Sequence, residues 1–384
     1  LPLMLLLFIF FPRIDPLWTM PLPSGKSTTG LSDSMSPGDI AELSRSDALA
    51  FRAGFSGERP SQAKLYWRAL TLEQFDGRRW SQARAWELAV APVWQKQGEP
   101  WRYSIVMQPT SRRWLFGLDV ARTDLTGARQ LSDFSLQAAD PLERSLLYEV
   151  ESWPESVRDP TLSANSLQRN LLIPTDGNPR SQAWAKQLQD QYAQPAALVQ
   201  ALLQHFNREA FFYTLRPPRS GLDSIDDFLF ESRSGFCEHY AGAMTYVLRA
   251  AGVPARVVTG YQGGEVNPAG NYVTVRQFDA HAWVEYWQPG TGWQTVDPTF
   301  QVAPERIEKG LQEAMAEEGS FLEDSPFSPL RYRQLAWLND LRLGWDNLNY
   351  GWQRWVLGYQ SRAQLELLKN WFGELRAERL AIVL

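Results

Sequence analysis

The only thiol of the chain precedes a histidine and an aspartate that complete a possible catalytic set. Cys237 follows a turn at 234–236 and begins a helical pattern, and His281 and Asp297 come after it in that order. A cysteine nucleophile needs a base to take its proton and a third group to fix the tautomer of that base. These residue types predict thiol-dependent attack on a carbonyl, with Cys237 as nucleophile, His281 as base and Asp297 as the orienting carboxylate.

The position of Cys237 in its predicted helix favours this chemistry. The helix is expected to run from Cys237 to Ala251, with Gly252 as its C-cap and Pro254 beyond it. Free backbone N–H groups and the positive end of the helix dipole in the first turn favour a thiolate. The same N–H groups can bind the oxyanion that forms when the thiolate attacks. Gly235, just before the helix, permits close approach of a substrate.

A predicted hairpin brings the other two residues together. His281 starts a strand over 281–287, Asp297 follows a strand over 292–296, and a Pro-Gly-Thr-Gly turn at 289–292 joins them. In an antiparallel pair, the start of one strand lies beside the end of the other. Each residue alone has an ordinary structural explanation, as a buried thiol, a hydrogen-bonded histidine or an Asp-Pro turn, but their combination favours catalysis.

Composition excludes several other functions. The net charge of −5 and the absence of a basic run exclude the electrostatic footprint of a nucleic-acid-binding protein. One cysteine rules out an intramolecular disulfide and a cysteine-based metal cluster. The histidines His205, His239 and His281 match no simple ligand spacing, so no metal site is predicted. His239 is expected on a different face of its helix from Cys237, and His205 on a helix face away from the chemistry.

The order of the predicted elements indicates an α+β protein. Residues 13–46 read as an extended linker, and 47–155 as a β-rich, sandwich-like domain with strands at 64–70, 101–107, 113–116 and 146–150. Residues 165–300 place helices before an antiparallel sheet, and 301–379 read as a helical segment. Most of the 17 tryptophans are interpreted as core and cross-strand packing.

Both ends of the chain carry apolar runs. Residues 1–12 are interpreted as the end of a transmembrane helix and 380–384 as the start of another, with a buried terminal segment as the alternative in each case. Between 341 and 355, leucine and tryptophan recur at steps of four and three, which predicts an amphipathic helix. Core packing is the favoured interpretation of this stripe, and anchoring at a membrane interface is the alternative.

Four sequence blocks together resemble the core of the transglutaminase-like superfamily. They are Ser234-Gly235-Phe236-Cys237-Glu238-His239-Tyr240-Ala241, Gly252-Val253-Pro254-Ala255-Arg256, His281-Ala282-Trp283-Val284-Glu285 and Trp293-Gln294-Thr295-Val296-Asp297-Pro298-Thr299. Before this core, Phe11-Pro12-Arg13, Thr29-Gly30-Leu31-Ser32-Asp33 and Leu65-Tyr66-Trp67-Arg68 resemble membrane-anchored bacterial protein-glutamine gamma-glutamyltransferases of the TgpA type.

The resemblance implies a papain-like core in which a helix carrying Cys237 packs on an antiparallel sheet, with His281 as general base and acid and Asp297 orienting it. It also implies a periplasmic portion held at a bacterial inner membrane by flanking helices. Animal transglutaminases add a tryptophan that stabilises the oxyanion. Here no tryptophan lies between Trp184 and Cys237, and Tyr213 is the candidate for that role.

The expected reaction is acyl transfer through a Cys237 thioester, from a glutamine carboxamide to a primary amine, without a metal or organic cofactor. The substrates would be a protein or peptide bearing glutamine and an amine acceptor, with cell-wall-associated chains among the candidates. Two alternatives stay open. A cysteine protease or amidase would use the same triad with water as acceptor, and a non-catalytic extracytoplasmic scaffold would bind its partners through the β-rich domain. How well the site excludes water would decide whether an amine or water accepts the acyl group.

Overall fold

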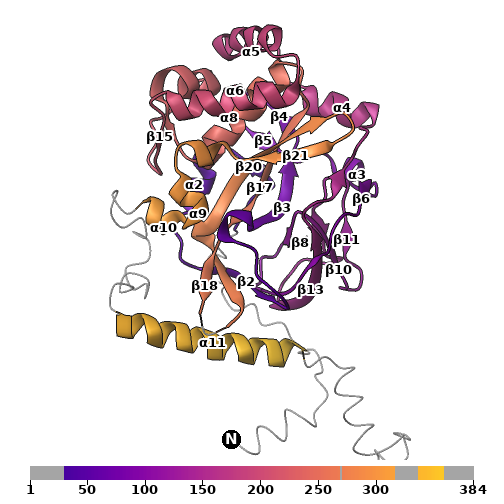
Figure 1. Ribbon diagram of the computed structural model, residues 1–384, viewed down its shortest axis with the longest axis vertical. Helices are drawn as coiled ribbons and strands as arrows, with labels where there is room; N and C mark the ends of the chain where they lie inside the picture. The colour runs from indigo at the N-terminus through magenta and orange to yellow at the C-terminus, as the bar shows by residue number, and fades with distance from the viewer. Residues whose placement is uncertain (1–29, 269, 316–335, 359–384) are drawn as a thin grey trace, which may run out of the picture. The chain divides into compact units, whose positions relative to one another are not determined.

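Two large sheets, one of six strands and one of seven, form the framework of the protein (Figure 1). The computed structural model describes residues 30–268, 270–315 and 336–358. Residues Thr29–Gly344 form one compact unit, which contains both sheets and all three residues of the predicted triad. The mixed α+β class predicted from the sequence is confirmed.

Neighbouring strands of the two large sheets are antiparallel, apart from the parallel pair β14–β21. The six-stranded sheet has the order β10 (Val120–Thr123), β13 (Leu146–Trp153), β7 (Trp101–Met107), β2 (Leu49–Phe55), β19 (Tyr272–Arg276), β18 (Glu265–Asn267). The seven-stranded sheet has the order β6 (Trp94–Gln95), β14 (Val157–Arg158), β21 (Gly292–Val296), β20 (Ala280–Gln288), β17 (Ala255–Gln262), β3 (Tyr66–Leu72), β9 (Gly117–Leu118).

Three small sheets complete the β structure of the described residues. The first contains β1 (Ser34–Met35), β5 (Trp80–Ser81) and β4 (Gln74–Phe75). The second contains β11 (Arg129–Gln130), β12 (Leu136–Gln137) and β8 (Trp114–Leu115). The third is a parallel pair of β15 (Phe212–Tyr213) with β16 (Ser234–Gly235).

Both large sheets combine strands from the two halves of the chain. β17 pairs with β3 on one side and β20 on the other, while β19 pairs with β2. The predicted boundary between a β-rich domain at 47–155 and a core at 165–300 therefore does not separate the sheets. A strand pattern alone could not show this, because period-two alternation fixes which face is buried but not which strand is the neighbour.

The chain passes between the sheets at two points on either side of the β18–β19 hairpin. Gly263 and Gly264, with φ of 79° and 125°, turn the chain from β17 into β18. The short 3-10 helix η3 (Gln277–Asp279) then returns it from β19 to β20. Buried aromatic rings fill the space between the sheets; Phe51 of β2 and Trp67 of β3 make an edge contact with ring centroids 5.3 Å apart.

Helices cover the seven-stranded sheet where the site lies. α8 (Cys237–Ala250) packs on β17 and β20 and is buried on nearly all sides, and α5 and α6 pack on α8 (Figure 1). The other helices are α2 (Asp39–Leu43), η1 (Gln62–Lys64), α3 (Ala85–Leu88), α4 (Ala164–Leu171), α5 (Pro179–Gln191), α6 (Pro195–Arg208), α7 (Ser224–Asp226), the π-helix η2 (Asp227–Ser232), η4 (Pro298–Gln301), α9 (Pro304–Glu308), α10 (Leu311–Ala314) and α11 (Ala336–Gly358).

Local signals predicted most of the core elements. The helix from Cys237 ends just before Gly252, whose φ is 80°, as a glycine C-cap requires. The described part of the predicted linker differs from the extended chain that the sequence indicated. Residues 30–46 contain β1 and α2, and Ile40 and Ala41 of α2 are buried. A high content of glycine and serine indicates irregular structure. It does not show that short elements such as β1 and α2 pack against the rest of the protein.

The predicted stripe between 341 and 355 lies on α11, and its side chains are exposed. Trp345 is 73% exposed and Trp352 57% exposed, so the favoured interpretation of core packing is wrong for these residues. None of the described helices is long and apolar enough to cross a membrane. Residues 1–12 and 380–384, interpreted as parts of transmembrane helices, lie outside the described residues.

Candidate active site

Cys237 begins α8 and lies against the strand that carries His281. Its side chain is 1% exposed, and its sulfur accepts a hydrogen bond from the backbone N–H of Ala282. Ala282 directly follows His281 near the start of β20, so the contact places the thiol against the backbone next to His281. The helix start that was predicted for the nucleophile is confirmed.

His281 and Asp297 are hydrogen-bonded neighbours. His281 Nε2 lies 2.8 Å from Asp297 Oδ2, and neither side chain is exposed by more than 6%. β20 and β21 form the predicted antiparallel hairpin, which brings the start of one strand beside the end of the other. The pair thus occupies the relation that general-base catalysis requires, with the carboxylate fixing the imidazole tautomer.

Two further groups hold the Asp297 carboxylate. The Tyr66 hydroxyl donates to Oδ2 at 2.8 Å, and the Thr299 backbone N–H donates to Oδ1 at 2.9 Å. Burial by itself would raise the pKa of Asp297, but His281 and these hydrogen bonds outweigh it and hold the pKa below its ordinary value. Sequence reasoning gave Tyr66 no role, because its strand β3 lies far from the triad along the chain.

The second ring nitrogen of His281 is available for the thiol. Among the described residues, Nδ1 of this buried imidazole has no hydrogen-bond partner. Burial lowers the pKa of His281, Asp297 opposes that effect, and the positive charge of Arg306 adds to it. The imidazole is therefore neutral at neutral pH, which is the state of a base ready to accept a proton.

The thiol is less acidic than its helix position predicts. Burial raises the pKa of Cys237 to about 12, against the opposing charge of Arg306 and the hydrogen bond from Ala282. Glu238 and Asp297 add to the increase. In this closed structure, exclusion of water outweighs the helix terminus, so the resting pair is a neutral thiol and a neutral imidazole.

Gly260 makes the close strand packing behind His281 possible. It pairs with His281 across β17–β20, and the β17–β3 register shifts at the same residue. A Cβ placed on Gly260 would lie 1.9 Å from the carbonyl oxygen of Trp67 on β3. A larger residue would thus separate the central strands directly opposite His281.

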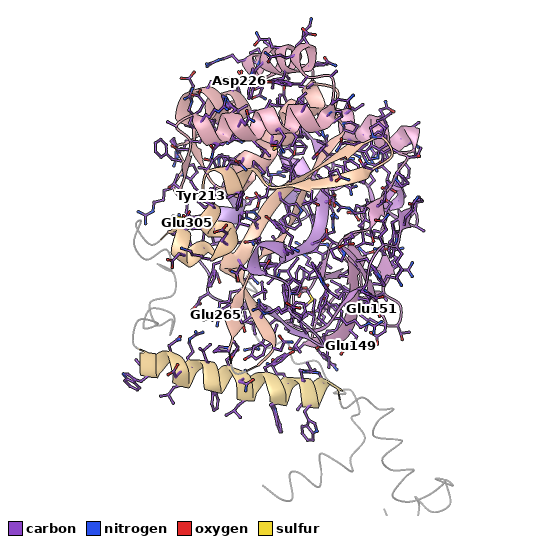
Figure 2. All side chains as sticks on the ribbon, in the orientation of Figure 1. Glu149, Glu151, Tyr213, Asp226, Glu265 and Glu305 are labelled. Carbon is purple, nitrogen blue, oxygen red and sulfur yellow. The ribbon has the colours of Figure 1, made fainter. Side chains whose placement is uncertain are left out.

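Tyr213, the candidate oxyanion residue, lies at the site. It pairs with Gly235 in the β15–β16 ladder, two residues before Cys237. Its hydroxyl is hydrogen-bonded to Arg306, and Figure 2 shows Tyr213 beside α9, which also carries Glu305. Burial and the neighbouring Cys237 raise the pKa of Tyr213 well above its ordinary value, so its hydroxyl keeps its proton.

A buried ionic cluster supports the strand that carries His281. Glu285, four residues after His281 on β20, forms ion pairs with Arg68, Arg158 and Arg256. Burial opposes ionisation of Glu285, but the three guanidinium groups outweigh it and hold its pKa well below its ordinary value. The cluster joins β3, β14 and β17 to β20. A charged residue within a buried strand was the available sequence signal for it.

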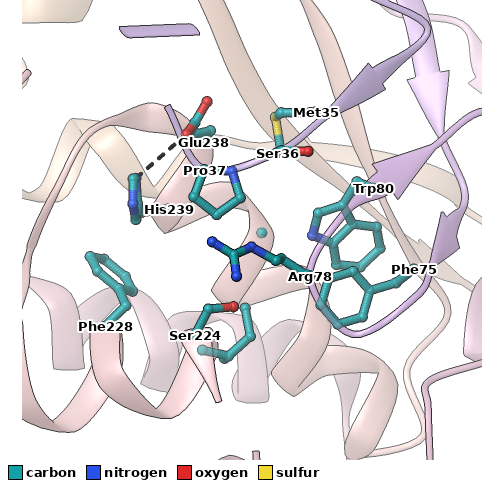
Figure 3. A pocket seen from close by; sticks show the side chains of 12 residues that line it. Met35, Ser36, Pro37, Phe75, Arg78, Trp80, Ser224, Phe228, Glu238 and His239 are labelled. Atoms are coloured by element: carbon teal, nitrogen blue, oxygen red, sulfur yellow. Dashed lines mark ion pairs between the residues drawn. The ribbon is translucent and has the colours of Figure 1, made fainter. Parts of the chain in front are cut away.

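The other two histidines lie elsewhere. His239 borders a small pocket of about 30 Å³ that is also lined by Pro37 and Phe228 (Figure 3). Burial lowers the pKa of His239 to about 4, so the ring is neutral. His205 packs against Trp184 on α5, with ring centroids 4.6 Å apart. Cys237 does not line the pocket beside His239.

A larger cleft of about 800 Å³ is lined in part by Tyr66, the residue that hydrogen-bonds Asp297. Tyr66 and Trp283 form part of its wall, and its rim carries the acidic residues Glu99 and Glu155. The Tyr66 and His281 ring centroids are 6.2 Å apart, so these aromatic groups lie between the cleft and the base. Cys237 does not line this cleft.

Comparisons with known proteins agree with this architecture. Residues 1–159 match the family described as the TgpA N-terminal domain, and residues 182–298 match the transglutaminase-like superfamily. The solved structure described as the periplasmic domain of TgpA from Pseudomonas aeruginosa is similar, with 60% sequence identity and a TM-score of 0.73; the match covers 74% of this chain and 99% of that chain. The chain belongs to the TgpA family of transglutaminase-like proteins.

Full-length relatives extend the comparison. This TgpA-type chain is 61% identical over 384 residues to a protein-glutamine gamma-glutamyltransferase of Pseudomonas aeruginosa and spans 58% of its length. It is 26% identical over 330 residues to the uncharacterized protein YebA of Bacillus subtilis; the match covers 75% of this chain and 45% of that protein. The chain thus spans about half the length of the curated relatives it matches.

Proposed function

We propose that this chain carries the catalytic portion of a protein-glutamine gamma-glutamyltransferase. The observation that supports this most is the arrangement of His281. Its Nε2 lies 2.8 Å from Asp297 Oδ2, its buried Nδ1 has no hydrogen-bond partner among the described residues, and the next residue, Ala282, is hydrogen-bonded to Cys237. The name of the 61% identical relative, protein-glutamine gamma-glutamyltransferase, agrees with it. The substrates in this proposal are a glutamine-bearing protein or peptide, cell-wall-associated chains included, and a primary amine.

Acylation begins with a proton transfer that substrate binding promotes. His281 Nδ1 takes the proton of the Cys237 thiol, and the thiolate attacks the carbon of a glutamine side-chain carboxamide. The C=O π electrons move to oxygen and form a tetrahedral oxyanion. When the intermediate collapses, His281 gives its proton to the departing nitrogen and ammonia leaves. The product of this half-reaction is a thioester on Cys237.

The second half-reaction reverses the roles. A neutral primary amine attacks the thioester carbon, and His281 takes a proton from the nitrogen. The carbon–sulfur bond then breaks, His281 gives that proton to the sulfur to restore the thiol, and the new amide leaves. Asp297 stabilises the imidazolium that forms in each half-reaction. Water in place of the amine gives hydrolysis instead, so the low exposure of Cys237 and His281 favours transfer.

Two groups are proposed to stabilise the oxyanion. The backbone N–H of Cys237 lies in the first turn of α8, where N–H groups have no helical partner. The Tyr213 hydroxyl, which keeps its proton, is the second donor in this proposal. Loss of one oxyanion donor typically lowers kcat by about 10²–10³-fold. We therefore expect Tyr213→Phe to lower kcat by a factor in that range.

One experiment tests the reaction against its alternatives. The 384-residue chain is incubated with casein and a fluorescent primary amine, and incorporation and cleavage are both followed by gel electrophoresis. Cys237→Ala, His281→Ala and Asp297→Ala are each expected to abolish incorporation, while Glu151→Ala on β13, which breaks an exposed ion pair with Arg102, serves as a control (Figure 2).

The outcomes separate three functions. Thiol-dependent incorporation supports the transferase, whereas thiol-dependent cleavage without incorporation would support a cysteine protease or amidase. No change that depends on Cys237 in either readout would support a non-catalytic binding scaffold. In the last two cases, the proposed reaction is wrong.

We also propose that the chain works at the periplasmic face of a bacterial inner membrane. The exposed stripe on α11 contains Trp337, Leu341, Trp345, Leu348, Trp352 and Trp355. At 100° per residue these positions fall within one narrow sector of the helix, and tryptophan prefers the water–hydrocarbon boundary. The solved periplasmic domain of the relative supports the compartment.

Vesicle flotation tests the membrane contact. The chain is mixed with vesicles of phosphatidylethanolamine and phosphatidylglycerol, and the floating fraction is measured. We expect the double variant Trp345→Ser, Trp352→Ser to float less than the parent chain, while Asn347→Ser, on another face of α11, floats as the parent does. Equal flotation of all three proteins would exclude α11 as the contact.

A further inference from the structure

Arg306 is a buried cation that sequence reasoning did not single out. It lies on α9, nine residues after Asp297 in the chain, and its side chain is 1% exposed. Nη1 donates to the Gln262 side-chain oxygen at 2.8 Å, and Nη2 donates to the carbonyl of Asp279 at 3.2 Å and of Ala280 at 3.4 Å. These two carbonyls belong to the residues directly before His281.

The guanidinium is bound by neutral groups. Among the described residues, no carboxylate forms an ion pair with Arg306, whereas the three arginines at Glu285 share a buried carboxylate. Its other partner is the Tyr213 hydroxyl. Burying a charge without an ion-paired carboxylate destabilises the folded protein. The presence of Arg306 here therefore indicates a role in the site.

We propose that Arg306 is a positioning residue of the active site, which fixes the Tyr213 hydroxyl and supplies the positive charge that stabilises a Cys237 thiolate. It acts through these two groups and does not itself contact the substrate. This inference rests on the proposed function, because it assigns Arg306 to the same reacting centre.

The electrostatic balance at the thiol supports the charge role. Burial has the largest effect on the pKa of Cys237, and the positive charge of Arg306 has the next largest. The charge of Arg306 favours the thiolate, whereas Glu238 and Asp297 both disfavour it. Arg306 also lowers the pKa of His281, but there Asp297 has the larger effect. Removing the cation leaves the thiol facing two carboxylates, which shifts the equilibrium toward the thiol.

The hydrogen bonds support the positioning role. Arg306 donates to the Tyr213 oxygen, since a guanidinium has no acceptor. The hydroxyl proton of Tyr213 then remains free to donate to another oxygen. The same guanidinium also binds the chain just before His281, so one residue links the oxyanion donor to the base.

Alkylation of Cys237 measures the charge role without any turnover. The reagent is iodoacetamide at pH 8, and the proteins are the parent chain, Arg306→Gln and Arg306→Lys. A nearby opposite charge changes a pKa by one unit or more, so Arg306→Gln is expected to react about tenfold more slowly. Arg306→Lys keeps the charge and is expected to react within about threefold of the parent rate.

The direction of the change distinguishes charge from structure. Loosening of the site exposes Cys237 and speeds alkylation, whereas loss of the charge slows it. Arg249→Gln is the matched control: Arg249 is also buried on carbonyl oxygens, at the far end of α8, and it does not act on the thiol. Where Arg306→Gln does not fold by circular dichroism, Arg306→Met carries the same expectation.

An unchanged or faster rate in folded Arg306→Gln would overturn the charge role, as would a tenfold slower rate in Arg306→Lys. The positioning role predicts that Arg306→Lys loses about tenfold or more in kcat of amine incorporation, and parent-like kcat would overturn it. The two proposals fail separately, because alkylation needs no transfer reaction. Slow alkylation of Arg306→Gln in a chain without amine incorporation would leave the charge role standing and the proposed reaction wrong.

Discussion

Replacing Glu285 by glutamine is expected to cause a large loss of stability. The substitution keeps the shape of the side chain but removes the charge that faces Arg68, Arg158 and Arg256 inside the protein. Hydrogen bonds to charged groups contribute about 1.5–3 kcal/mol each, but three bonds that share one carboxylate are not additive. Breaking a buried ion pair costs about 3–5 kcal/mol, and we take this as the expected loss in free energy of unfolding.

The assay is thermal unfolding followed by circular dichroism at pH 7. An unfolding entropy of about 2.1 cal/mol/K per residue gives a Tm shift of about 1.2 °C per kcal/mol for a chain of 384 residues, so Glu285→Gln should unfold about 4–6 °C lower. Glu151→Gln is the matched control, because Glu151 pairs with Arg102 at 2.9 Å with both side chains exposed. Such pairs contribute about 0.2–1 kcal/mol. An equal drop in Tm for both variants would refute the reasoning.

The pH dependence provides a second check on the same residue. The folded-state pKa of Glu285 is depressed, so its stabilising effect is present above the unfolded pKa, about 4.3, and is lost as the pH falls toward the folded value. The Tm difference between the parent chain and Glu285→Gln should thus be constant from pH 6 to 8 and shrink below pH 4. A difference that grows on acidification would contradict the assignment.

Three further predictions concern the triad. Gly260→Ala is expected to lower amine incorporation and Tm together, because its Cβ would displace the strand opposite His281; parent-like values would contradict this packing. Tyr66→Phe removes a hydrogen bond that keeps the pKa of Asp297 low, so the acid limb of kcat/KM should move to higher pH, and an unmoved limb would show that Tyr66 does not act on the carboxylate. Alkylation of Cys237 should accelerate about tenfold per pH unit from pH 7 to 9, since burial raises its pKa to about 12; a plateau in that range would be inconsistent with a buried thiol.

The sequence predicted the site elements well because their signals are local. Gly252 marks the end of the nucleophile helix, and the turn at 289–292 fixes the hairpin that joins His281 to Asp297. Both depend on backbone conformations that few residue types adopt. The sequence therefore predicted that His281 and Asp297 lie side by side and that Cys237 begins a helix, before the fold was known.

What the sequence could not show depends on contacts between distant segments. Tyr66 and Arg306 reach the triad from β3 and α9, and neither has a neighbour in sequence that marks it. The acidity of Cys237 was predicted with the wrong sign, because the helix dipole is visible in a sequence and burial is not. The stripe on α11 has the period of a buried face, yet period alone does not say whether protein or another apolar phase faces it.

The pairing of β3 with β17 also sets a condition on synthesis of the chain. Arg68 on β3 pairs with Gly260 on β17, so the partner of an early strand is made 192 residues later. At ribosomal rates of about 5–20 residues per second, that delay is roughly 10–40 s. For this time the edge of β3 has no partner from β17, and long-range pairing is slow to form. We therefore expect the nascent protein to need protection of an open sheet edge, and we expect truncation before residue 260 to leave an aggregation-prone fragment rather than a smaller domain.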